Sequence, residues 1–136
     1  MNTRNKQTDT SSIRGAAVVE LAVVLPLLLT LVFGIIEFGW LFMVRETLTN
    51  ASREGCRVAV LQGSTDQNIN NQVAASMAGA SLTGYTVGIT HSTPGNSTEK
   101  VAVSIPYSQV SLVGSYFGPT NFNLSATTAM RKEGAD

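Results

Sequence analysis

Residues 14–45 read RGAAVVELAVVLPLLLTLVFGIIEFGWLFMVR, and the rest of the chain is arranged around them. Between the two terminal arginines lie 30 residues, of which only Glu20 and Glu37 are charged. An α-helix rises about 1.5 Å per residue, so 30 residues extend roughly 45 Å, whereas the hydrocarbon core of a bilayer is about 30 Å thick. The stretch therefore predicts a helix that crosses a membrane and emerges on the other side.

The two glutamates are spaced to suit the two faces of a bilayer. They are 17 residues apart, which corresponds to about 25 Å along a helix axis. We expect each carboxylate to lie near one boundary of the hydrocarbon core, where it still reaches water or headgroups. Trp40 and Phe42 come shortly after Glu37, at the level where membrane proteins carry a belt of interfacial aromatic side chains.

Pro26 interrupts the apolar run. It has no N–H to donate to the carbonyl of Ala22, so it predicts a kink or a local loosening of the helix. Two interpretations stay open. Proline is common in membrane helices, and a soft spot would also help a helix that has to move between a bilayer and an assembly.

The charges that flank the apolar run predict its orientation. Three basic residues and one acidic residue precede it, whereas Arg45 on the far side is followed at once by Glu46. An excess of Lys and Arg marks the cytoplasmic side, so we expect a cytoplasmic N-terminus and an exported C-terminal part. The apolar run is longer than that of a secretory signal peptide and no clear Ala-x-Ala site follows it, which favours an anchor over a signal peptide.

Beyond Arg45 the pattern remains helical. Small or apolar residues recur on one face, which predicts that another element approaches this face closely; they are Leu48, Ala51, Ser52, Gly55, Cys56 and Ala59. One helix from about Ala16 to Leu61 is the economical interpretation, half in the membrane and half amphipathic. Thr65 and Asp66 are suited to cap a second, short helix.

After residue 84 the hydrophobic period changes from near 3.6 to 2, which predicts strands. Alternation occurs at 85–89, 101–105 and 122–130, and a Pro-Gly turn lies within 92–98. A three-stranded sheet with one apolar face needs a cover, and the two helices supply it. We therefore predict an α+β fold: a long N-terminal helix, a short second helix and a small antiparallel sheet packed on the long helix.

Composition excludes several classes of function. The formal net charge is zero and there is no basic stripe, which argues against a nucleic-acid partner. A single cysteine, Cys56, and a single histidine, His91, cannot form a Cys/His metal site or an internal disulfide. No nucleophile–base pair or phosphate loop can be assembled, so we predict no enzyme, no cofactor and no small-molecule substrate.

Three individual residue assignments follow. We expect Cys56 to be a packed small residue and His91 to be plain surface. Tyr116 and Phe117 fit a subunit contact and a core anchor equally well.

The start of the apolar run resembles a known processing site. Gly15 is preceded by Arg14 and followed by four small or apolar residues and then Glu20, as in type IV-type prepilins. The run RGAAVVELAVVLPLLLTLVFGIIEFG, with LTNASREGCRVAV after it, is similar to the TadE-like family, whose members accompany the Tad (tight adherence, Flp) pilus machinery. The resemblance covers about Arg14 to Val60.

The resemblance implies a pseudopilin or minor pilin. A prepilin peptidase would cut after Gly15, so that Ala16 becomes the N-terminus and Glu20 the fifth residue of the mature chain. In a fibre, the new ammonium group and the carboxylate of a neighbouring subunit would be tolerable together where each alone is costly to bury. The implied partners are the membrane, other pilins and pseudopilins, the peptidase and the Tad inner-membrane assembly platform.

The expected organisation is a cleaved cytoplasmic leader at 1–15, a transmembrane helix at 16–44 and an exported pilin-like head at 45–136, in the inner membrane or in a surface pilus used in adhesion or secretion. The alternative is an uncleaved single-pass scaffold or secretion accessory, which would not depend on Glu20. Glu37 and Pro26 are possible assembly or interface residues. For Glu37 we favour an interfacial carboxylate near the exported boundary over an assembly contact.

Overall fold

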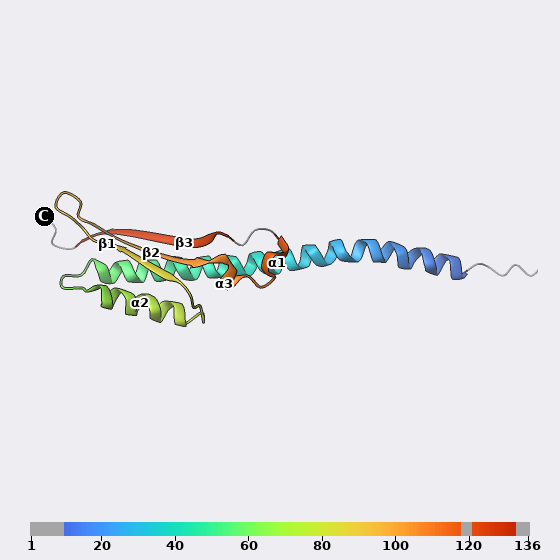
Figure 1. The fold of residues 1–136 in the computed structure, drawn as a ribbon, viewed down its shortest axis with the longest axis horizontal. Coiled ribbons are helices and arrows are strands. Elements are labelled where there is room, and N and C mark those ends of the chain that lie inside the picture. The colour runs from blue at the N-terminus through green and yellow to red at the C-terminus, as the bar shows by residue number, and fades with distance from the viewer. Residues whose placement is uncertain (1–9, 118–120, 133–136) are drawn as a thin grey trace, which may run out of the picture. The chain divides into compact units, whose positions relative to one another are not determined.

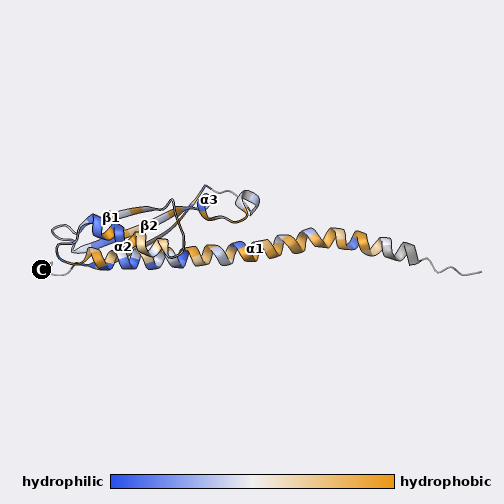
Figure 2. Cartoon of the chain, turned by 90° about the horizontal axis from the view of Figure 1, so that it is seen from below, coloured by the Kyte–Doolittle hydropathy of each residue, from blue (hydrophilic) through white to orange (hydrophobic). Residues whose placement is uncertain are grey.

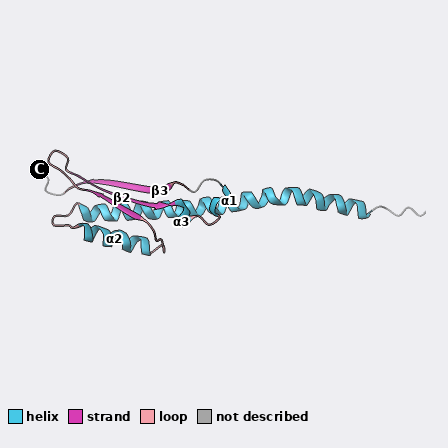
Figure 3. Cartoon of the chain, in the orientation of Figure 1, coloured by secondary structure: helices cyan, strands magenta, loops and turns pink. Residues whose placement is uncertain are grey.

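The computed structural model describes residues 10–117 and 121–132, and it confirms the predicted α+β fold (Figures 1 and 3). In chain order the elements are α1 (Thr10–Ala59), α2 (Asp66–Ala78), β1 (Thr86–Thr90), β2 (Thr98–Pro106), α3 (Tyr107–Val110), the 3-10 helix η1 (Gly114–Phe117) and β3 (Asn123–Arg131). The described helices thus include the long and the short helix that were predicted, with two single-turn helices between the last two strands.

The chain divides into two compact units after Ile36. The first contains the apolar part of α1. The second, Glu37–Asp136, contains the rest of α1 and every other described element, and we call it the head. The head therefore begins at Glu37, within the range 16–44 that was assigned to the membrane helix.

Helix α1 is continuous through Pro26. The hydroxyl of Thr30 donates to the carbonyl of Pro26 at 2.8 Å, one turn further along. The helix ends at Ala59, close to the predicted Leu61, and Gly63 follows with a φ of +76°. This left-handed conformation suits glycine and turns the chain towards α2.

Helix α2 begins where its capping residue predicts. The hydroxyl of Thr65 accepts a hydrogen bond from the backbone N–H of Asn68 at 3.3 Å, which satisfies one of the unpaired amides of the first turn. Ile69, Val73 and Met77 are buried, and their spacing of four residues forms one apolar face.

The three strands form one antiparallel sheet in the order β1-β2-β3. Val103 of β2 lies opposite Val87 of β1 and Ala126 of β3. The turn between β1 and β2 is closed by the bridge between Thr93 and Asn96. Predicted alternation is confirmed, because the apolar set of each strand faces the helices.

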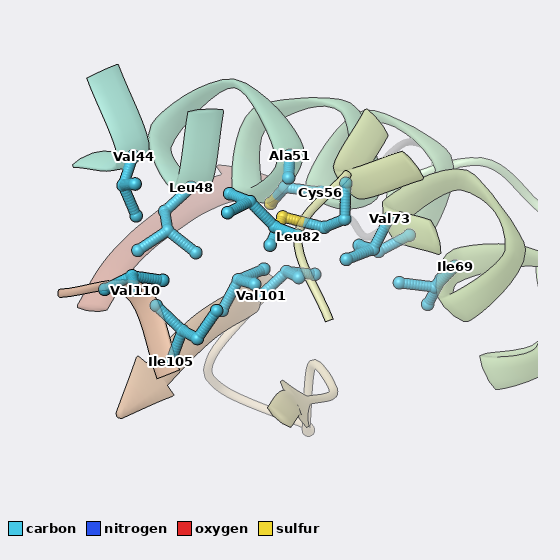
Figure 4. Packing of buried hydrophobic residues seen from close by; sticks show 13 residues of the cluster. Val44, Leu48, Ala51, Cys56, Ile69, Val73, Leu82, Val101, Ile105 and Val110 are labelled. Atoms are coloured by element: carbon cyan, nitrogen blue, oxygen red, sulfur yellow. The ribbon is translucent and has the colours of Figure 1, made fainter. Parts of the chain in front are cut away.

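The core of the head lies between the sheet and the two helices (Figure 4). Its fully buried side chains come from α1, α2 and β2 and include Leu48, Cys56, Ile69, Val73, Met77, Val101, Val103 and Ile105. The small face predicted for α1 is confirmed at Gly55. A Cβ there would lie 2.7 Å from Cγ2 of Val73 and 3.2 Å from Cγ1 of Val101, so the glycine permits this close approach.

Side-chain contacts show how the sheet runs along α1 within the head. The Tyr107 hydroxyl contacts Glu37 at the start of the head, the Thr128 hydroxyl contacts Ser52 at 2.8 Å, and the carbonyl of Glu99 contacts Cys56 at 3.5 Å. We call the end with Glu37 and Tyr107 the base of the head. The end with Glu99 and the β1–β2 turn is its tip.

Candidate membrane segment and assembly site

The first unit presents an apolar surface without a cover. No residue from 15 to 36 is buried, and most of the exposed residues are Val, Leu, Ile or Phe. Figure 2 shows this part of α1 as almost continuously hydrophobic, whereas hydrophobic and hydrophilic residues alternate along the part within the head. Among the described helices, α1 alone is long and apolar enough to cross a membrane.

The predicted processing residues lie in this first unit. Gly15 is helical and exposed, and a Cβ built on it would have nothing within 4 Å. Ala16 and Glu20 are both exposed and lie four residues apart on α1, so they share one helix face. No hydrogen bond or ion pair joins Glu20 to the residues that the structure describes. Its carboxylate is therefore available to a partner outside this part of the chain.

Glu37 has the opposite environment. Its side chain is only 3% exposed. One carboxylate oxygen accepts from the hydroxyls of Tyr107 at 2.8 Å and Ser111 at 2.7 Å. The other accepts from the backbone amides of Leu112 at 3.0 Å and Val113 at 3.2 Å.

The expectation that the Glu37 carboxylate reaches water or headgroups is therefore wrong. The carboxylate is enclosed by the segment that follows β2, and four donors replace the water that it loses. Burial of a charged group without such donors costs several kcal/mol. Glu37 thus ties the loop between α3 and η1 to α1.

Trp40 strengthens the same junction. Its indole N–H donates to the carbonyl of Val110 at 2.6 Å, and its ring is half-buried. Two aromatic residues, Trp40 and Phe42, were assigned to an interfacial belt. Trp40 instead packs against the head of the same chain. Phe42 remains exposed.

A second buried carboxylate lies at the tip of the head. Glu99 accepts from the backbone N–H and the hydroxyl of Ser92 at 3.0 and 2.9 Å. It also pairs with Lys132 at 3.3 Å and with Nδ1 of His91 at 3.1 Å. Burial opposes ionisation, but these hydrogen bonds outweigh it and hold the pKa of Glu99 below its usual value.

His91 is therefore more than the plain surface residue that was expected. Its Nδ1 contacts Glu99, and its Nε2 contacts the carboxylate of Asp66 at 2.8 Å. The ring is half exposed and joins the start of α2 to the β1–β2 turn.

Cys56 is buried as predicted. Tyr116 is 68% exposed, so the interpretation of Tyr116 as a core anchor is wrong. The side chain of Phe117 lies outside the described residues.

Sequence reasoning missed the partners of both buried carboxylates. Glu37 was visible as a single charge in an apolar run, and Tyr107 and Ser111 near an apolar loop were the available signal; Glu99 lies next to Lys100 in a polar stretch and gave no such signal. That signal does not say which donor meets which carboxylate. The structure brings Glu37 together with its donors but joins neither Glu20 nor Pro26 to them.

Comparison with known proteins identifies the helical segment. Residues 15–57 match the family model described as TadE-like protein. This segment is TadE-like. No curated protein and no solved structure matches the chain.

The TadE-like segment spans most of α1. It includes Gly15, Glu20 and Glu37 and extends to Gly55 in the core of the head, while the strands lie outside it. The match confirms the predicted resemblance. Together with the membrane-length apolar helix, it relates the chain to the membrane components of the Tad pilus, a system served by structural proteins of this family.

Proposed function

We propose that this protein is a non-enzymatic pseudopilin or minor pilin-like subunit that takes part in Tad pilus assembly. It is inserted in the inner membrane with its N-terminus in the cytoplasm and its head exported, and it is cut after Gly15. The observation that carries the proposal is the uncovered apolar surface of residues 15–36 within a TadE-like segment. A bilayer covers this surface before assembly, and the apolar helices of neighbouring subunits cover it in a fibre.

Cleavage after Gly15 would create an ammonium group at Ala16 among apolar side chains. A charge buried in this way costs several kcal/mol unless it is paired. The exposed carboxylate of Glu20 is suited to pair with the ammonium group of an adjacent subunit. Such a pair would fix the axial register of two helices that otherwise present only apolar side chains to each other.

The leader provides the first test. Mass spectrometry of the protein from its native host should find Ala16 as the N-terminus, and Gly15→Val should leave residues 1–15 attached. Valine is suitable because its branched Cβ hinders an extended backbone in a protease cleft, whereas glycine does not. Recovery of an intact N-terminus from the unmodified protein would refute processing.

Glu20→Gln provides the second test. We expect cleavage to continue but pili on cells to be lost or greatly reduced, because the ammonium group at Ala16 is left unpaired. Glu46→Gln is the matched control, since Glu46 is also an exposed glutamate on α1 but lies beyond the apolar stretch. Normal piliation with both variants would favour an uncleaved or permanently anchored scaffold over a pilin-like subunit.

A further inference from the structure

The base of the head lacks exposed charge. Residues 38–44 and 101–130 contain no Asp, Glu, Lys or Arg. Glu37 is the one carboxylate at this end, and it is buried with four hydrogen-bond donors around it. Among the residues that the structure describes, the surface of the base therefore carries no ionised side chain, the kind that is most costly to remove from water.

Apolar and aromatic side chains stand exposed on this uncharged end. Phe38 is 79% exposed, Leu112 is 58% exposed and Tyr116 is 68% exposed. Phe42 is exposed one helical turn beyond Phe38, so the two share a face of α1. These four residues come from two segments far apart in the sequence, α1 and the loop that contains η1. We call them the base patch.

Glu37 holds the two segments of the base patch together. The backbone N–H of Leu112 lies 3.0 Å from its carboxylate, and the carbonyl of Val110 binds Trp40 on the next turn of α1. Leu112 is therefore fixed beside Glu37. Glu37 directly follows Ile36, the last residue of the apolar stretch.

Charge is concentrated at the opposite end of the head. Asp66, His91, Glu99 and Lys132 form the network at the tip. On α1 the first charged residue after Glu37 is Arg45, about two turns further along. The head thus has an uncharged end, which contains Glu37, and a charged end at its tip.

We propose that the base patch forms a second membrane contact, lying in the interface between lipid headgroups and acyl chains. The head is then seated on the bilayer in addition to being anchored in it. Exposed aromatic rings, with tyrosine among them, are the side chains that favour this layer. Continuity along the chain favours lipid over another occupant, because the base patch begins two residues after the apolar stretch ends.

This inference rests on the proposed membrane insertion, and depth measurements separate the two. In the full chain, Cys56→Ala removes the one cysteine, and single cysteines are then introduced at Leu112, Tyr116, Leu31 and Asn70. Each is labelled with the fluorophore NBD in vesicles of phosphatidylcholine and phosphatidylglycerol that contain nitroxide lipids, labelled either near the headgroup or deep in the acyl chain. Leu31 reports on the apolar stretch, and Asn70 is an exposed control on α2.

We expect the labels at Leu112 and Tyr116 to lose emission with the shallow nitroxide, the label at Leu31 with the deep one, and the label at Asn70 with neither. Agreement between Leu112 and Tyr116 guards against a local effect of either substitution on folding. Quenching at Leu31 with Leu112 and Tyr116 behaving like Asn70 would overturn the second contact and leave membrane insertion standing.

Two other results would also overturn the proposal. If Leu31 is not quenched, the chain is not inserted and both proposals fail. If the labels at Leu112 and Tyr116 are shielded only at high protein-to-lipid ratio and are not quenched by lipid, another copy of the chain covers the base patch. Dilution in lipid distinguishes that case, since a contact with lipid persists when chains are far apart.

Discussion

At the scale of single residues, the head depends on two buried glutamates, Glu37 and Glu99, whose carboxylates are hydrogen-bonded. Glu37→Ala removes the acceptor for two backbone amides and two hydroxyls, which leaves buried donors unsatisfied. We expect the head to lose about 2–4 kcal/mol of unfolding free energy. In hydrogen exchange, the amides of Leu112 and Val113 should lose protection first. Glu46→Ala is the exposed control. If the amides of Leu112 and Val113 were as well protected in Glu37→Ala as in the wild type, the role of Glu37 would be contradicted.

Glu99 predicts a dependence of stability on pH. Its pKa is lower in the folded head than in an unfolded chain. The carboxylate therefore contributes stability above the ordinary glutamate pKa, and this contribution is lost as the pH falls through the lowered folded value. Glu99→Gln should melt at lower temperature than the wild type at neutral pH, and the difference should shrink in acid. A difference that stays constant with pH would exclude ionisation of Glu99 as its cause.

At the scale of elements, the junction of α1 with α2 and β2 depends on the absence of a side chain at Gly55. An added methyl would meet Val73 at 2.7 Å and Val101 at 3.2 Å. Overpacking of a tight core costs about 1–3 kcal/mol, against a gain in helix propensity of about 1 kcal/mol. We expect Gly55→Ala to be destabilising by up to about 2 kcal/mol in chemical unfolding.

Gly39 offers the matched control on the same helix. A Cβ there would have nothing within 4 Å, so Gly39→Ala should retain or slightly raise the unfolding free energy. The double variant Gly55→Ala with Val73→Ala should show coupling, because the smaller side chain makes room for the methyl. Strict additivity of the two changes would refute the contact as the cause.

At the scale of the whole molecule, the distribution of basic residues predicts that the head is exported. A cysteine introduced at Asn70, in a Cys56→Ala chain, should react with a membrane-impermeant maleimide added to spheroplasts, because Asn70 is exposed on α2. A cysteine at Asn2 in a Gly15→Val chain, which keeps its leader, should react only after lysis. The reverse pattern would show that the head faces the cytoplasm.

Much of this architecture follows from local patterns. The length of the apolar run predicts the membrane helix, the four-residue spacing of Ile69, Val73 and Met77 predicts α2, and alternation predicts β2. The small face of α1 around Gly55 also predicts a close approach. These patterns are local because periodicity along one segment is enough to define an apolar face.

The environments of Glu37, Glu99 and His91 could not be predicted in this way. Glu37 meets Tyr107 and Ser111 from segments about 70 residues away, and Glu99 meets Lys132, which directly follows β3. Such pairs depend on strand register and on which end of the sheet lies beside which end of α1. A carboxylate therefore shows its charge in the sequence, whereas burial and donor geometry are established only when distant segments pack together.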